Sequence, residues 1–226
     1  MRSYLRTVGA VLRKDLLLEW RSREAITSMA FFSLLVVVLF GFAFQAERID
    51  PRTQAGGLLW VAFSFSGVLG LHRSFAVERE GSCLQGLLLA PVDRSALFLG
   101  KVIGNFLLIL AVEAVTFPVF SILLRVSILP HFGPLALIAA LGTLGFAEVG
   151  TLLATVSSGS RLREVLLPLI LYPIWVPVLI ASVEVTGMVL AGEGLAAGGR
   201  WIALVLAYDL VFLGVGLMLF DHLLEE

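Results

Sequence analysis

The sequence predicts an all-α, polytopic membrane protein with six transmembrane helices, and two observations support this. Of its 226 residues 59% are hydrophobic and only 15% are charged, with a mean hydropathy of +1.00. One soluble core cannot bury that much apolar surface, so lipid must act as the solvent. In addition, six apolar stretches approach the roughly 20 residues needed to cross a hydrocarbon core of about 30 Å.

The six spans follow one another in a single domain, 1–226, separated by polar connectors. Their approximate bounds are 25–46, 55–71, 96–124, 133–156, 165–190 and 201–220. Proline and glycine in the connectors 47–54, 127–134 and 192–199 are typical of turns. Twelve of the sixteen Lys and Arg residues fall on one side of this arrangement. Because cytoplasmic loops carry the excess of basic residues, both termini are predicted to be cytoplasmic.

The segment 3–21 before the first span is predicted to form an amphipathic helix in the membrane interface. Apolar residues recur at near-helical spacing, and basic residues occupy the rest of the helical wheel. These apolar residues are Leu5, Val8, Leu12, Leu16 and Trp20. The helix would contact lipid headgroups through its basic face. The alternative is that the segment only serves as a charged flank that orients the first span.

A second amphipathic segment, 78–91, lies in the predicted cytoplasmic connector between spans two and three. Glu78 and Glu80 lead to Gly81, and Ser82 with Gln85 matches a capping box, so a short helix should begin there. Pro91 would end it. Its apolar face consists of Leu84, Leu87 and Leu88. The pattern alone is equally consistent with two arrangements. The helix could dock in a groove of a partner protein, or it could pack back onto the bundle or the membrane surface.

Three blocks of the chain, 14–21, 59–101 and 166–180, resemble the haem exporter permease family of cytochrome c maturation (CcmB-like proteins). The order of acidic cluster, Gly-Ser, Leu-x-x-Leu-Leu and proline is similar to the cytoplasmic coupling segment of type-2 ABC exporter membrane domains. One departure is Arg161-Leu162-Arg163-Glu164, where that family has a glycine pair. The resemblance covers essentially the whole chain.

The resemblance implies a bacterial inner-membrane permease with a separate ABC ATPase subunit and haem-handling partner subunits. Our working hypothesis is a homodimer of this chain that acts with two ATPase subunits. ATP hydrolysis would drive either haem export or the release of a haem-loaded chaperone. The strongest alternative is a non-transporting membrane scaffold of a haem-attachment complex. The residues assigned to ATPase coupling are Glu78, Glu80, Gly81, Ser82, Leu84, Leu87, Leu88 and Pro91.

The chain is not expected to be an enzyme by itself or to bind a cofactor. It has no Gly-x-x-x-x-Gly-Lys-Ser/Thr motif, so ATP is expected on the partner subunit. Its one cysteine, Cys83, excludes an intramolecular disulfide and multi-cysteine metal sites. Haem would be cargo, and His131, beside a span end, is the candidate haem contact, the alternative being a solvated loop histidine. A net charge of −1 without a basic run argues against nucleic-acid binding.

Carboxyl groups within spans are costly, so they are candidate pathway residues. Counting residues along the spans places Glu113 and Asp209 at similar depth, about 18 Å from the inner surface and about 12 Å from the outer one. They would either face a shared polar cavity or each bond to a neighbouring helix. Glu148 and Glu184 are predicted nearer to the two surfaces.

Two kinds of residue in the spans predict bending and close packing of helices. Pro168, Pro173 and Pro177 remove backbone donors from span five, so this span should bend, either as a deformable gate or as a permanent shape. Glycines in spans three and four permit close helix contact, within the chain or across a homodimer. These glycines are Gly100, Gly104, Gly142, Gly145 and Gly150.

Overall fold

The computed structural model describes residues 2–47, 51–80, 93–157 and 162–223, and within these ranges the regular structure is entirely helical. The helices are α1 (Arg2–Ser22), α2 (Glu24–Glu47), α3 (Pro51–Glu80), α5 (Arg94–Leu124), η1 (Leu129–His131), α6 (Phe132–Ser157), α7 (Arg163–Leu190), α8 (Gly194–Ala197) and α9 (Gly199–Leu223). Six of them, α2, α3, α5, α6, α7 and α9, are long and apolar enough to cross a membrane. The predicted fold class and the six spans are therefore confirmed.

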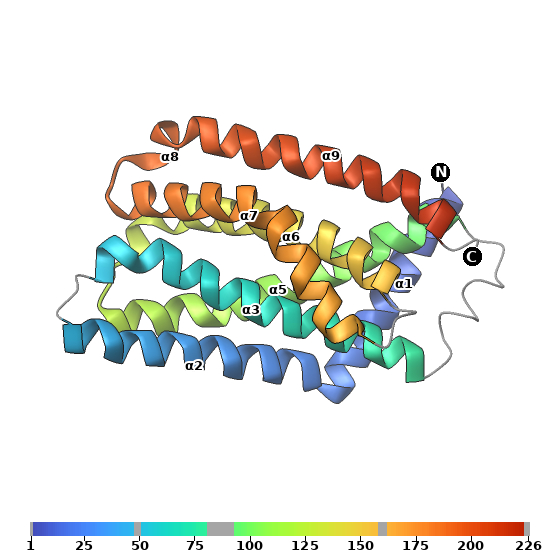
Figure 1. Ribbon diagram of the computed structural model, residues 1–226, viewed down its shortest axis with the longest axis horizontal. Coiled ribbons are helices and arrows are strands. Elements are labelled where there is room, and N and C mark those ends of the chain that lie inside the picture. Colours follow the sequence, from blue (N-terminus) through green and yellow to red (C-terminus); the bar gives the residue numbers. More distant parts are fainter. Residues whose placement is uncertain (1, 48–50, 81–92, 158–161, 224–226) are drawn as a thin grey trace.

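The six long helices run side by side in one bundle (Figure 1). Helices α2 and α9 lie at opposite edges, and α3 and α6 occupy the centre, where more than half of the residues of each span are buried. The outer helices expose apolar side chains such as Phe31 and Leu210, as expected for a surface that faces lipid. Both ends of the chain lie at the same end of the bundle, here called the terminal end, while α8 lies at the distal end.

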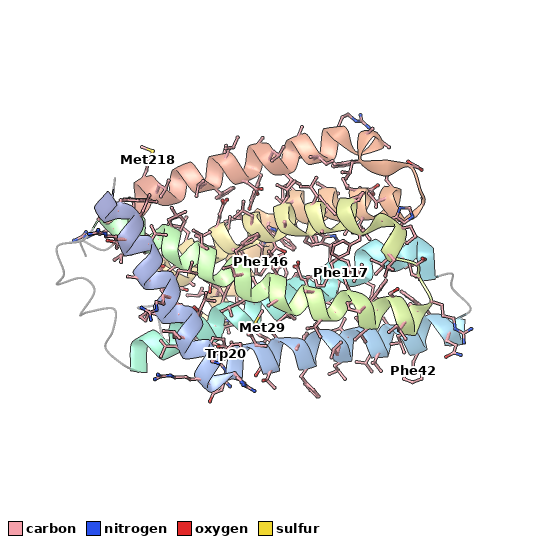
Figure 2. The ribbon with its side chains drawn as sticks, turned by 180° about the vertical axis from the view of Figure 1, so that it is seen from behind. Trp20, Met29, Phe42, Phe117, Phe146 and Met218 are labelled. Carbon is pink, nitrogen blue, oxygen red and sulfur yellow. The ribbon has the colours of Figure 1, made fainter. Side chains whose placement is uncertain are left out.

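Helix α1 crosses the bundle at the terminal end and packs against α5 (Figure 2). The two helices approach closely because Gly100 has no side chain: a Cβ there would lie 2.9 Å from Cβ of Val11. Asp15 of α1 forms an ion pair with Lys101 of α5 at 3.0 Å, and Lys101 is 5% exposed. The sequence allowed close contact at Gly100 either within the chain or across a homodimer, and the structure shows a contact within the chain.

A sharp elbow joins α1 to α2. Arg23 has a positive φ of 54°, and its N–H donates to the Glu19 carbonyl at 2.7 Å, which ends α1. The Glu19 side chain then accepts a hydrogen bond from the Ile26 N–H at 2.8 Å and so caps the first turn of α2. Exposed Trp20 lies beneath the Arg23 guanidinium, 5.8 Å from ring centroid to carbon. The elbow fixes α1 at a steep angle to the bundle.

Aromatic packing around Gly142 forms the centre of the bundle. The Trp60 indole donates to Thr186 Oγ1 at 3.0 Å, and the Trp175 indole donates to the Gly142 carbonyl at 3.4 Å. The two indole rings lie 6.1 Å apart, and Phe146 meets Trp175 edge-on at 5.0 Å. Tryptophan is tolerated in a core when its N–H finds an acceptor, as both do here.

Helix α7 bends along its length but remains one helix despite Pro168, Pro173 and Pro177 (Figure 1). Tyr208 of α9 donates to the Ile174 carbonyl at 3.2 Å, next to Pro173. The predicted bend is therefore present, and a cross-helix hydrogen bond supports it.

Helix α3 continues beyond the predicted span to Glu80, so Glu78 and Glu80 belong to its last turn. The remaining coupling residues, from Gly81 to Pro91, lie outside the described residues, and so does Cys83. Asp93 caps the N-terminus of α5 by accepting a hydrogen bond from the Ser95 N–H at 3.0 Å.

Candidate functional site

Glu113 lies in the middle of α5 and is held against α6. Its residue is 1% exposed, and Oε1 accepts a hydrogen bond from the Thr143 hydroxyl at 2.5 Å. The other oxygen, Oε2, has no hydrogen-bond partner among the residues that the structure describes. Hydrogen bonding to a neighbouring helix was one of the two arrangements predicted for this carboxyl group.

A pocket of about 200 Å³ lies beside Glu113, between α5 and α6. Its walls are almost entirely apolar, and Glu113 is the one ionisable residue among them. The lining residues are Leu110, Glu113, Ala114, Phe117, Ile128, Phe132, Leu135, Ala136, Ala139 and Ala140. Because Phe132 begins α6, the pocket extends from mid-bundle toward the distal end.

Asp209 of α9 meets a different face of α6. Its Oδ1 lies 2.6 Å from the place where a Cβ on Gly145 would be, so glycine makes room for this carboxyl group. Glu148, one helical turn along from Gly145, is close enough to Asp209 for the two side chains to interact electrostatically. Asp209 is 5% exposed and Glu148 is 1% exposed. All four carboxyl oxygens lack a hydrogen-bond partner among the described residues.

The structure thus brings Asp209 together with Glu148 and not with Glu113. Thr143, which holds Glu113, and Gly145, which faces Asp209, are two positions apart on α6, or about 200° around the helix. The two carboxyl groups therefore lie on different sides of α6, and no pocket described for this chain is lined by both. Glu148 is buried within the bundle and does not reach a surface, whereas Glu184 is exposed as expected.

The other predicted pathway and cargo residues lie apart from these carboxyl groups. Pro173 and Pro177 are exposed on α7. His131 is half-buried in η1 at the distal end, next to Phe132 of the pocket rim. No group of three or more His, Cys, Asp and Glu residues within the described ranges is arranged to hold a metal ion. The role of each residue in a pathway stays a prediction.

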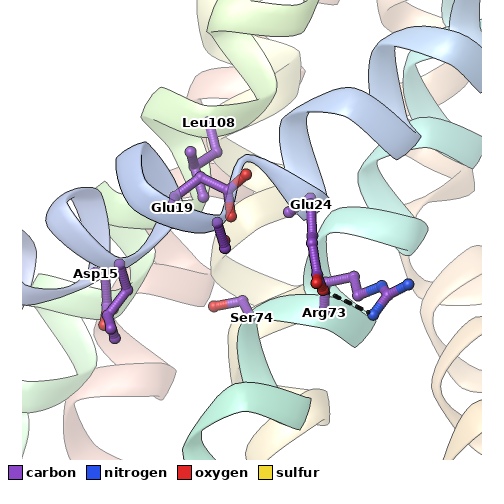
Figure 3. A pocket seen from close by; sticks show the side chains of 9 residues that line it. Asp15, Glu19, Glu24, Arg73, Ser74 and Leu108 are labelled. Atoms are coloured by element: carbon purple, nitrogen blue, oxygen red, sulfur yellow. Dashed lines mark hydrogen bonds and ion pairs between the residues drawn. The ribbon is translucent and has the colours of Figure 1, made fainter.

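A second pocket, of about 100 Å³, lies at the terminal end beneath the α1–α2 elbow (Figure 3). Asp15, Glu19 and Glu24 line it, together with Arg73 near the end of α3. Arg73 pairs with Glu24 at 3.2 Å, and both side chains are more than half exposed. The predicted coupling segment begins in the last turn of α3, at this same end of the bundle.

Polar pairs between helices complete the set of residues that the sequence did not reveal. Asn105 donates to Thr151 Oγ1 at 2.9 Å, and the hydroxyls of Ser33 and Thr116 share a hydrogen bond of 2.8 Å. The signal available in the sequence was a single polar residue inside an apolar span. Such a residue predicts an internal position but not its partner.

Comparisons with known proteins cover nearly the whole chain. A family model described as "CcmB protein" matches residues 6–225. The "Heme exporter protein B" of Rhodobacter capsulatus is 30% identical over 187 residues, which is 83% of this chain and 84% of that protein. Proteins of the same name from Paracoccus denitrificans and Pseudomonas aeruginosa are 31% identical over 175 residues (77% and 80%) and 28% identical over 202 residues (88% and 88%).

Proposed function

The chain belongs to the CcmB protein family, and we propose that it is the membrane permease subunit of an ABC transporter of cytochrome c maturation. The observation that carries this proposal is the match over residues 6–225 together with a bundle of six membrane-crossing helices. A protein built almost wholly of such helices offers a pathway or a scaffold.

ATP hydrolysis in a separate subunit is part of the proposal, because the 226 residues contain no phosphate-binding loop. The segment 78–91 would receive the motion of that ATPase. Its first residues form the last turn of α3, which lies at the terminal end with α1. The excess of Lys and Arg supports a cytoplasmic position for this end, and therefore an inner-membrane protein with both termini inside.

Haem is the proposed cargo, either exported directly or carried by a chaperone that ATP hydrolysis releases. The name "Heme exporter protein B" of the relatives from Rhodobacter capsulatus and Paracoccus denitrificans supports this choice of cargo. Haem-handling subunits and a second copy of this chain would complete the assembly. His131 at the distal end is the residue proposed to contact exported haem, since histidine is a common axial ligand of haem iron.

Purification of the chain from its native membrane, followed by an ATPase assay, tests the proposal. Recovery of an ATP-binding subunit is expected. Leu84→Asp or Leu87→Asp should lower that recovery and the ATPase rate, because a charge on the apolar face of the segment opposes docking in an apolar groove. Leu129→Asp, at an exposed position of the distal end, is the matched control and should leave both unchanged.

The outcomes separate the permease from a scaffold. If no ATP-binding subunit is recovered, or if the Leu84 and Leu87 variants assemble and hydrolyse ATP like the unmodified chain, the coupling proposal is wrong. If the ATPase is recovered but a hydrolysis-defective ATPase leaves haem attachment intact, the chain is a non-transporting scaffold.

A further inference from the structure

The pocket between α5 and α6 combines apolar walls with one buried carboxyl oxygen that lacks a partner. Glu113 Oε2 has no hydrogen-bond partner among the described residues, and Glu113 lines the pocket. Burying a polar atom without a partner costs free energy, so such an atom beside a cavity indicates a group that completes it. Thr143 holds the other oxygen in place and thereby fixes the direction of the carboxyl group.

Small side chains create the hollow. Ala114 of α5 and Ala136, Ala139 and Ala140 of α6 line it, and larger residues at these positions would reduce the space. Leu110 and Phe117 of α5 lie about 10 Å apart along the helix, which gives the length of the pocket. The space is long enough for a short apolar body but offers it one polar anchor.

The pocket opens on the surface of the bundle that faces lipid. Ala114 and Phe132 on its wall are both exposed, and Phe132 is 65% exposed. Both lie on spans whose hydropathy suits a membrane interior. A ligand would therefore enter sideways from the half of the bilayer at the distal end, with Glu113 at the deep end of the pocket.

We propose that this pocket binds an amphiphile that carries a hydrogen-bond donor, an ammonium or a hydroxyl group, on an apolar body. The donor would bond to Glu113 Oε2, and the apolar body would fill the space between the alanines. Hydrogen-bond complementarity selects this occupant, because a plain acyl chain satisfies the walls but leaves the carboxyl oxygen without a partner. The inference goes beyond the proposed function and does not depend on the ATPase.

Photolabelling of the purified chain in lipid nanodiscs tests the inference. Three diazirine probes share one alkyl chain and end in an amine, a hydroxyl or a methyl group, and mass spectrometry locates the labelled peptides. The amine and hydroxyl probes should label the α5 and α6 peptides about tenfold more than the methyl probe, which is the effect of giving a partner to one buried polar atom. The ratio of amine to hydroxyl labelling identifies the preferred donor.

Two variants and a matched control make the test specific. Glu113→Leu removes the acceptor and leaves an apolar side chain of similar size, so labelling by the donor probes should fall about tenfold to the level of the methyl probe. Ala136→Phe fills the hollow and should abolish labelling by all three probes. Glu184→Leu removes an exposed carboxylate elsewhere and should change nothing. Thermal unfolding of each variant establishes that it is folded. If Glu113→Leu does not fold, Ala136→Phe alone tests whether the probes bind in the pocket.

Three results would overturn the inference. Equal labelling by all three probes would mean that ordinary lipid tails fill the pocket. Unchanged labelling of Glu113→Leu would mean that the carboxyl group is not the anchor. A disulfide between two copies carrying Ala136→Cys, in a chain whose own Cys83 is replaced by serine, would mean that a second copy covers the pocket.

Discussion

Gly142 is the position at which adding one methyl group should damage the bundle most clearly. A Cβ on Gly142 would overlap the Trp60 ring and would lie 2.7 Å from Ser182 Oγ. Neither neighbour can easily move. The Trp60 indole is fixed by its hydrogen bond to Thr186 and by contact with the Trp175 ring, and Ser182 is completely buried. Gly142→Ala therefore overpacks the centre of the core.

The net effect follows from two opposed terms. Overpacking a tight core costs about 1–3 kcal/mol, while replacing a glycine inside a helix with alanine gains up to about 1 kcal/mol. The expected result for Gly142→Ala is a loss of about 1–2 kcal/mol, or a decrease in Tm of roughly 2–8 °C for a chain of this size. In α9, Gly214 has no described atom within 4 Å of its Cβ position. Gly214→Ala should therefore raise Tm slightly, because only the helix term remains.

Thermal unfolding of the two variants and the unmodified chain, in the same detergent, decides between these outcomes. Tryptophan fluorescence is a suitable signal because two of the four tryptophans contact Gly142 or its neighbours. A Tm for Gly142→Ala equal to or above that of Gly214→Ala would show that the packing around Trp60 is looser than described, and the reasoning would fail.

Two further predictions concern the ion pairs of α1 and α2 and the orientation of the chain in the membrane. Asp15→Asn should destabilise the chain by on the order of 3 kcal/mol, because it breaks an ion pair whose Lys101 side chain is 6% exposed. Glu24→Gln breaks only an exposed pair with Arg73 and should cost less than about 1 kcal/mol. Equal Tm values for the two variants would contradict this prediction. Cys83 should react with a membrane-impermeant maleimide only in inverted vesicles, since the basic loops predict a cytoplasmic connector. Labelling of Cys83 from the outside of intact cells would mean that the orientation is the reverse of the predicted one.

Local patterns allowed the sequence to predict the elements of the fold. Span length and hydropathy identified the six membrane-crossing helices, and the amphipathic repeat identified α1. The Asp93 cap was predictable because it depends on residues two positions apart. In each case the residues that decide the structure are neighbours in the chain, and the bilayer thickness sets the length of each helix.

The candidate site was predictable only in part, as Glu113 and Asp209 illustrate. Counting along a helix gives the depth of a carboxyl group, and on depth alone the two residues suit one cavity. Their direction around the bundle depends on how α5 and α9 pack against α6. Thr143 on one side and Gly145 on the other separate them, and Glu148 becomes the neighbour of Asp209.

By itself, the sequence determined that this chain has six helices long and apolar enough to cross a membrane, the approximate bounds of most of them, and that one amphipathic helix precedes them. Only the tertiary structure decided that Gly100 packs against α1, that Gly142 packs against the Trp60 ring, and that Glu113 lies beside an apolar pocket. The physical reason is that hydrophobic burial in lipid acts on each helix separately, whereas packing depends on side-chain shape between helices that are distant in the sequence.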